Sequence, residues 1–200
     1  MKLHRLALLT ASSAALACAH PSLSGTPVPV DTVASGEATS AGFKPTGDVF
    51  FGPAGGAGRS VAYSDSRIVG PRANMTRAQN GQWAGNLAGK DLVLNVEPGR
   101  ITGDGVDLLV ARDGTTVDVQ GMFGQRQVRM TLGPKGIQGT TNSSRCSFDL
   151  TLERAGVYRG GVSCRGAVDV ATLHLTGEAA QVESSGLPQL VLALIDVLPS

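Results

Sequence analysis

Apolar and polar residues alternate with a period of two across residues 73–181, which is typical of β-strands that bury one face. Two alternating runs flank Asp113-Gly114, a dipeptide that favours a hairpin turn in which both central residues have positive φ. Folding at this turn places Val110 opposite Val117, so that the apolar residues of both runs share one face. A one-residue slip would turn that face toward water, so the predicted register is self-consistent.

The alternation continues into the next run of the chain. A turn at Gly124-Gln125 places Val119 opposite Met130, and the same face stays apolar through three successive strands. Earlier in the chain, residues 49–51 and 59–63 have the composition of short strands on either side of a glycine-rich turn. That turn does not lead from a strand into a helix, which argues against a phosphate-binding loop. The pattern predicts a meander of antiparallel strands.

The chain also contains an internal repeat. Residues 87–103 align without gaps with residues 123–139, at an offset of 36. Residues 74–85 align with residues 149–160, and both segments have a glycine two residues before an aromatic residue and another two after it. Three related units, 36 and 39 residues apart, are marked by residues at equivalent positions: Trp83, Val119 and Tyr158. Periods of this length are typical of proteins built from repeated structural units.

These features predict an all-β fold, either an antiparallel meander barrel or a sandwich, built from three units of about 36–39 residues. A β-trefoil is the alternative, because three units of about four short strands suit its pseudo-threefold symmetry. Residues 185–200, with Pro188 near their start, predict a short helix that plugs or covers the open end of the sheet. About eleven helical residues are too few to span a bilayer.

Two cysteines meet in a third predicted hairpin. A turn at residues 154–156 places Cys146 opposite Cys164 on the neighbouring strand. Cysteines in this position in an exported protein are expected to oxidise. The sequence therefore predicts a disulfide that closes a loop of about 19 residues and stabilises the fold by roughly 3 kcal/mol. Two buried thiols, or a bond from one of them to Cys18, are the alternatives.

Residues 1–17 have the pattern of a secretory signal peptide. Lys2 and Arg5 precede an apolar stretch that ends in small residues. Residues 15–18, Ala-Leu-Ala-Cys, resemble the lipobox of bacterial lipoproteins. The resemblance implies cleavage before Cys18, a diacylglyceryl group on its sulfur and a fatty acyl group such as palmitate on its new amino group. Because the next residue is Ala rather than Asp, it also implies retention at the outer membrane.

Two other cleavages fit the same residues. An ordinary secretory cut after Ala17 would leave Cys18 as a free thiol, and a cut after Ala19 would remove it, so that the protein would be periplasmic or secreted. Residues 18–48 contain four prolines among small and polar residues and show no strand or helix period, which predicts a flexible tether. Residues 49–184 are then the β domain, followed by the C-terminal helical segment.

Composition and charge exclude several classes of function. Lys and Arg number 17 against 16 Asp and Glu, a formal charge of +1, and loss of residues 1–17 leaves 15 basic residues and a charge of −1. A protein that binds nucleic acid normally has a basic surplus. Aromatic residues make up 4% of the chain, too few for a surface that stacks bases. We therefore expect no nucleic-acid partner, and contact with a membrane through the lipid anchor.

Candidate catalytic and metal-binding residues are few. His174 is the one histidine of the predicted β domain, and the chain has no Gly-x-Ser-x-Gly nucleophile motif. Four aspartates lie close together in the chain, but their spacing does not match an EF-hand calcium loop. They are Asp104, Asp107, Asp113 and Asp118. The sequence predicts no metal, no cofactor and no catalytic residue, and hence a protein that is not an enzyme.

The leading hypothesis for function is a non-catalytic envelope lipoprotein that binds or scaffolds another component of the cell envelope, with an envelope protein as the expected partner. The second is a secreted inhibitor or small-ligand-binding barrel, because residues 81–83, Gly-Gln-Trp, resemble the opening of lipocalin-like barrels and of small secreted protease-inhibitor barrels. That hypothesis requires a solvent-connected cavity or a protruding loop. The third is an enzyme whose site forms around His174 only in the folded chain.

Overall fold

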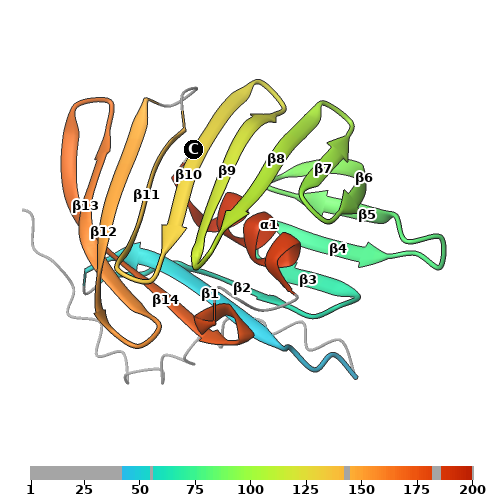
Figure 1. Cartoon of the computed structure of the whole chain (residues 1–200), viewed down its shortest axis with the longest axis horizontal. Helices are drawn as coiled ribbons and strands as arrows, with labels where there is room; N and C mark the ends of the chain where they lie inside the picture. Colours follow the sequence, from blue (N-terminus) through green and yellow to red (C-terminus); the bar gives the residue numbers. More distant parts are fainter. Residues whose placement is uncertain (1–41, 55, 142–144, 182–185, 200) are drawn as a thin grey trace, which may run out of the picture. The chain divides into compact units, whose positions relative to one another are not determined.

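The computed structural model describes residues 42–54, 56–141, 145–181 and 186–199. Within these residues, successive antiparallel strands close into one barrel (Figure 1). Each strand pairs with its neighbours in the chain, and the last strand pairs with the first. The strands are β1 (Gly47–Pro53), β2 (Arg59–Tyr63), β3 (Arg67–Gly70), β4 (Ala73–Arg77), β5 (Trp83–Leu87), β6 (Lys90–Glu97), β7 (Arg100–Gly103), β8 (Val106–Asp113), β9 (Thr116–Phe123), β10 (Arg126–Gly133), β11 (Gly136–Thr141), β12 (Cys146–Arg154), β13 (Val157–Cys164) and β14 (Ala167–Gly177).

The strand order confirms the predicted antiparallel meander barrel and its short C-terminal helix. Strands follow one another around a single closed sheet in the order in which they occur in the chain. A sandwich would divide them between two sheets, and a β-trefoil would not place every strand beside its neighbours in sequence, so both alternatives are wrong. Closure also leaves none of the described strands with a long unpaired edge.

The predicted registers are confirmed for two of the three hairpins. Val119 pairs with Met130 between β9 and β10, and Cys146 pairs with Cys164 between β12 and β13. The register of β8 and β9 is wrong by two residues, because Val110 pairs with Val119 instead of Val117. The turn is at residues 114–115, after the pair formed by Asp113 and Thr116. A shift of two residues keeps every side chain on its predicted face, so the apolar pattern could not detect the error.

The wall of the barrel is apolar inside and polar outside. In β8, the inward residues Val106, Leu108 and Val110 are buried, and the residues between them are exposed. The same alternation along the other strands and the buried residues of the helix together form one hydrophobic core. Such alternation is typical of antiparallel sheets with one face on a core and the other toward water.

The three repeat markers are buried, and each is followed two residues later by a glycine that also faces the barrel interior. In β9 this glycine is Gly121, with φ of 145°. A Cβ atom at Gly121 would lie 2.0 Å from the carbonyl oxygen of Asp107 on β8, so a larger residue would push the two strands apart. The unit that begins with Tyr158 contributes only β13 and β14 to the wall before the chain enters the helix.

The C-terminal helix α1 (Leu187–Val197) lies inside the barrel (Figure 1). Residues 189–197 are all buried, and apart from Gln189 and Asp196 they are apolar. A helix that is apolar on every side is stable only when it is surrounded. The segment therefore fills the interior, whereas the sequence predicted that it plugs or covers the open end of the sheet. The one-turn helix η1 (Glu178–Ala180) follows β14.

The first strand begins at Gly47, two residues before the predicted start of the β domain. The predicted signal peptide, Cys18 and most of the predicted tether lie outside the described residues. Among the described residues, no helix combines the length and apolar character that crossing a membrane would require.

Candidate functional site

Side chains of the wall and of α1 occupy the interior of the barrel, so the candidate binding sites lie on its surface. α1 is enclosed by the wall, and its residues from Leu190 to Val197 are at most 4% exposed. Between Met130, Phe148 and Ile195, the space left beside the helix is about 10 Å³, no more than one water molecule would need. The candidate sites are therefore the two rims of the barrel and its outer wall.

We call the two rims after the position of the helix. The helix-end rim, where α1 ends, consists of the turns at residues 71–72, 88–89, 104–105, 124–125 and 165–166, with the adjoining starts of β2, β6 and β10. The opposite rim consists of the turns at residues 64–66, 78–82, 98–99, 114–115, 134–135 and 155–156. Charged residues lie on both rims, but the arginines that contact the end of α1 belong to the helix-end rim.

Asp196, in the last turn of α1, lies fully buried at the helix-end rim. Its Oδ1 atom accepts a hydrogen bond from the backbone N–H of Ala88 at 2.9 Å, and its Oδ2 atom has no hydrogen-bond partner among the described residues. Burial raises the pKa of the Asp196 carboxyl, whereas the charge of Arg72 and the Ala88 hydrogen bond oppose that shift. A buried carboxylate with one unsatisfied oxygen is costly unless cations stand nearby.

Three arginines from distant parts of the chain gather around this carboxylate. Arg72 places Nε 3.9 Å from Oδ1 of Asp196, and Arg59 donates from Nη1 to the Asp196 backbone oxygen at 3.3 Å. Arg126 lies with Ile195 and Leu198 at the end of the helix. Burial lowers the pKa of Arg126, the charge of Arg72 lowers it further, and Asp196 opposes the shift. The pKa of Arg59 is lowered in the same way. The positive charge of Arg72 thus disfavours the charged forms of both Arg59 and Arg126.

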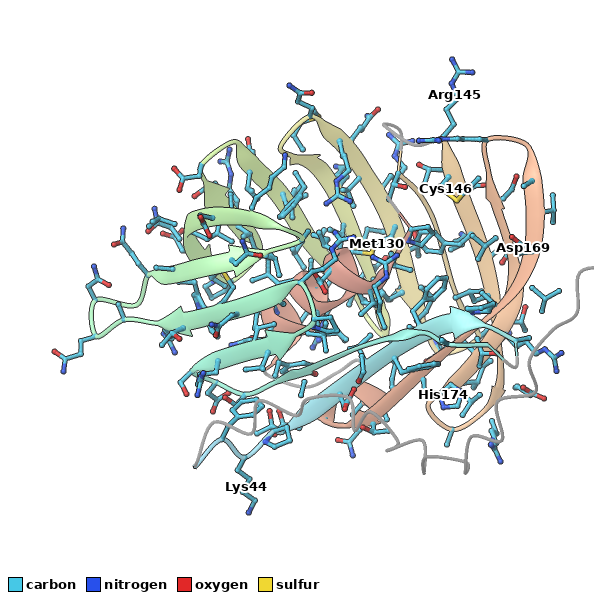
Figure 2. The ribbon with its side chains drawn as sticks, turned by 180° about the vertical axis from the view of Figure 1, so that it is seen from behind. Lys44, Met130, Arg145, Cys146, Asp169 and His174 are labelled. Atoms are coloured by element: carbon cyan, nitrogen blue, oxygen red, sulfur yellow. A yellow bond between two sulfur atoms is a disulfide. The ribbon has the colours of Figure 1, made fainter. Side chains whose placement is uncertain are left out.

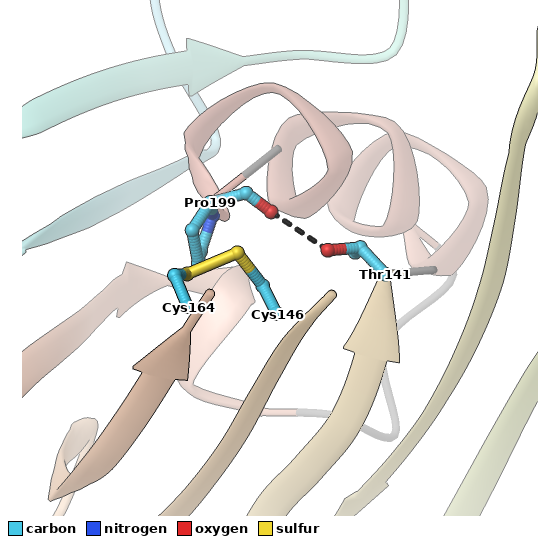
Figure 3. The surroundings of a disulfide bond; sticks show 4 residues. All are labelled: Thr141, Cys146, Cys164 and Pro199. Carbon is cyan, nitrogen blue, oxygen red and sulfur yellow. Dashed lines mark hydrogen bonds between the residues drawn. A yellow bond between two sulfur atoms is a disulfide. The ribbon is translucent and has the colours of Figure 1, made fainter. Parts of the chain in front are cut away.

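The same rim carries the disulfide. Cys146 and Cys164 are bonded, with Cα atoms 4.1 Å apart, as the sequence predicted (Figure 3). Beside them, Thr141 donates its hydroxyl hydrogen to the carbonyl oxygen of Pro199 at 2.9 Å. The wall is therefore bonded to the chain that leaves the helix as well as to the helix itself. Arg145, next to the disulfide, points away from the barrel and does not belong to the arginine cluster (Figure 2).

The outer wall has a shallow polar groove over β9 to β12. Its volume is about 520 Å³, and its lining includes four threonines, Lys135, Gln138 and Asp149. Thr131, one of the four, donates a hydrogen bond to Asp118 at 2.6 Å. An adjoining hollow of about 290 Å³ shares Thr131, Gln138 and Asp149 with it. The groove offers many neutral hydroxyl groups but no convergence of like charges.

The residues considered for catalysis and metal binding stay apart in the fold. His174 is half-buried on β14 (Figure 2). Its ring and that of Phe50 pack edge to face, with their centroids 5.6 Å apart. Asp107 pairs with Arg100 at 3.0 Å, and Asp104 accepts a hydrogen bond from the N–H of Val93. No group of three or more possible metal ligands occurs among the described residues. These side chains serve pairing and turns.

The arginine cluster was not predicted from the sequence. One signal was available: Asp196 is the only charged residue of the apolar segment 187–198, and a lone carboxylate there requires a partner from elsewhere. Nothing in the sequence pattern distinguishes Arg59, Arg72 and Arg126 from the other arginines. Comparison of the chain with protein-family models, with curated proteins and with solved structures gives no match.

Proposed function

We propose that this protein is an exported, lipid-anchored component of the bacterial outer membrane whose barrel binds or scaffolds another envelope component, an envelope protein being the expected partner, and that it catalyses no reaction. The observation that carries the proposal is the enclosed helix. Because α1 occupies the interior, recognition is left to the rims and the outer wall. A small-ligand carrier would need the space that the helix takes.

The anchor rests on the lipobox resemblance of residues 15–18 and on no feature of the barrel. Two or more acyl chains hold a protein stably at a bilayer, whereas one gives only reversible binding. The tether would let the barrel move away from the membrane surface and reach a partner. A domain that recognises through its surface suits this arrangement.

Replacement of Cys18 by Ala tests the anchor. We expect the variant to leave the membrane fraction and appear among soluble envelope proteins. Ala19→Asp is the matched control, because it keeps the acylated cysteine and is expected to move the protein from the outer to the inner membrane. If Cys18→Ala stays with the membrane, the anchor proposal is wrong.

Crosslinking in intact cells tests the binding role separately. A photoreactive residue at Arg129 on the outer wall or at Arg126 on the helix-end rim is expected to capture a discrete partner, whereas one at buried Val119 is not. Equal labelling from all three positions would show that the barrel has no preferred binding surface.

A further inference from the structure

We propose that the helix-end rim binds a phosphate-type oxyanion between the guanidinium groups of Arg59, Arg72 and Arg126. The inference concerns the barrel alone and does not depend on the lipid anchor. It goes beyond the proposed binding role because it assigns a surface and a ligand chemistry.

The first support is a surplus of positive charge. Three guanidinium groups lie around the end of α1, where Arg72 and Arg59 contact Asp196 and Arg126 lies beside Ile195, and Asp196 is the one carboxylate that the described residues place among them. The C-terminal end of α1 adds the equivalent of about half a negative charge at the same place. The surplus therefore exceeds one positive charge. Like charges that gather at a half-buried site raise the free energy of the folded protein, and an anion that lies between them would remove that repulsion.

The second support is a set of unused hydrogen-bond donors. Each guanidinium has five N–H donors. Among the described residues, the three arginines make one hydrogen bond within this cluster, from Arg59 to the Asp196 backbone oxygen. Arg72 lies 3.9 Å from Oδ1, beyond hydrogen-bonding distance. Arg126 places its guanidinium 5.0 Å from the centre of the Phe123 ring, a contact that leaves its N–H groups open.

The surroundings strengthen these charges. Phe123 and Ile195 are buried beside the cluster, and Arg72 has 34% of its side chain exposed. Electrostatic attraction is stronger in such half-buried places than in bulk water. A fourth cation stands on the same rim, because Nζ of Lys90 lies 2.5 Å from where a Cβ atom of Gly124 would be.

The residue types point to a phosphate-type anion. Arginine forms planar, paired hydrogen bonds that match the oxygens of phosphate and sulfate. A tetrahedral anion offers oxygens in several directions and can therefore accept from three guanidinium groups at once. Asp196, a single planar carboxylate at the base of the cluster, leaves most of the donors unused.

Titration of the full chain with inorganic phosphate and with pyrophosphate, followed by calorimetry at low and high salt, tests the proposal. We expect binding in the millimolar range or tighter that weakens as salt rises. Arg126→Gln should weaken it about tenfold, the loss typical of one charge-assisted hydrogen bond. Arg129→Gln is the matched control, because it removes the same charge from an exposed position on the same strand. Asp196→Asn should tighten binding, since it removes the competing carboxylate.

Thermal unfolding of each variant shows whether it is folded at the temperature of the titration. The proposal is overturned if neither anion binds to the wild-type protein, or if Arg126→Gln and Arg129→Gln weaken binding equally. A structural role for Arg126 would change its melting temperature without changing phosphate affinity relative to Arg129→Gln, and that result also overturns it.

Vesicles identify the source of the phosphate group. If it is a lipid headgroup, the wild-type protein binds vesicles of phosphatidic acid and phosphatidylcholine more tightly than vesicles of phosphatidylcholine alone, and Arg126→Gln removes the difference. If it is a free phosphate or a soluble phosphate ester, phosphate binds but the two kinds of vesicle are equivalent. Both results support the oxyanion site, and any contribution of the N-terminal segment is the same in each variant.

Discussion

The two rims of the barrel are built from the same hairpin connections but differ in what they hold. The helix-end rim contains the buried carboxylate of Asp196, the arginine cluster and the disulfide. The opposite rim has a hollow of about 340 Å³ whose lining, from Thr115 and Pro134 to Tyr158 and Gln181, includes no charged residue. The hollow at the opposite rim is therefore neutral, although charged residues such as Asp65 and Lys135 lie in the turns of that rim.

Backbone strain shows the same asymmetry. The residues other than glycine that have positive φ within the described chain all lie in turns at the end of the barrel where α1 ends. They are Ala88, Asp104, Arg145 and Arg165. At the opposite rim, positive φ falls on glycines such as Gly99, Gly114 and Gly156. At Ala88 the backbone N–H donates a hydrogen bond to the buried carboxylate of Asp196, and this contact offsets the cost of the positive φ. Strain is tolerated where the surrounding contacts hold it.

The largest expected effect comes from the helix that joins the rims. Leu194→Ala removes a fully buried side chain and should lower the free energy of unfolding by about 3 kcal/mol. Leu190→Ala, one turn earlier and equally buried, should cost a similar amount. Denaturant unfolding measures both. If the helix is held mainly at its C-terminal end, hydrogen exchange at the Ala88 amide rises more in Leu194→Ala. Equal hydrogen exchange at the Ala88 amide in the two variants would show that the helix is not held mainly at its C-terminal end.

Removal of the disulfide should have an effect of similar size. The Cys146→Ser, Cys164→Ser double variant is expected to lose about 3 kcal/mol, because the unfolded chain regains the freedom of a 19-residue loop. Exposed Ser147, next to Cys146 on β12, provides a control through Ser147→Ala, which should change stability by less than about 0.5 kcal/mol. If the double variant is less stable but its amides near Thr141 exchange hydrogen no faster, the disulfide does not restrict local opening of the helix-end rim.

The pH dependence of stability tests the buried carboxylate. The pKa of Asp196 is raised in the folded state above its ordinary value of 3.8. Between these two pKa values the folded state binds more protons than the unfolded state, so stability falls as pH rises through this interval and then stays lower. Asp196→Asn should remove this part of the pH profile while its amide oxygen still accepts from Ala88. If the free energy of unfolding depends on pH in the same way in the wild-type protein and in Asp196→Asn, the pKa of the Asp196 carboxyl is not raised in the folded state.

The smallest effects compare single turn residues at the two rims. Ala88→Gly should relieve the strain of φ near 53° and raise stability by less than about 1 kcal/mol, net of the greater freedom of glycine in the unfolded chain. Gly114→Ala at the opposite rim should lower stability by a similar amount, since its φ is 57° and no atom lies within 4 Å of the added Cβ. Melting temperatures of the two variants should move in opposite directions. A shift in the same direction would mean that Ala88 is not strained.

Features that depend on neighbouring parts of the chain were predictable. The pairing of Val119 with Met130 and the disulfide follow from hairpins whose turn and flanking residues are adjacent in sequence. The register error at Asp113 arose because two different turns place the same side chains on the inner face. Local alternation specifies the face of a strand more firmly than it specifies the pairing.

By itself, the sequence determined which residues face inward, approximately where the chain reverses and which cysteines meet, because each depends on alternation and turn chemistry within about twenty residues. Only the tertiary structure decided that the sheet closes on itself, that α1 lies within it, and that Arg59 reaches a residue 137 positions away. These are contacts between distant segments. They depend on how many strands surround a buried helix, and the alternation within any one hairpin does not specify that number.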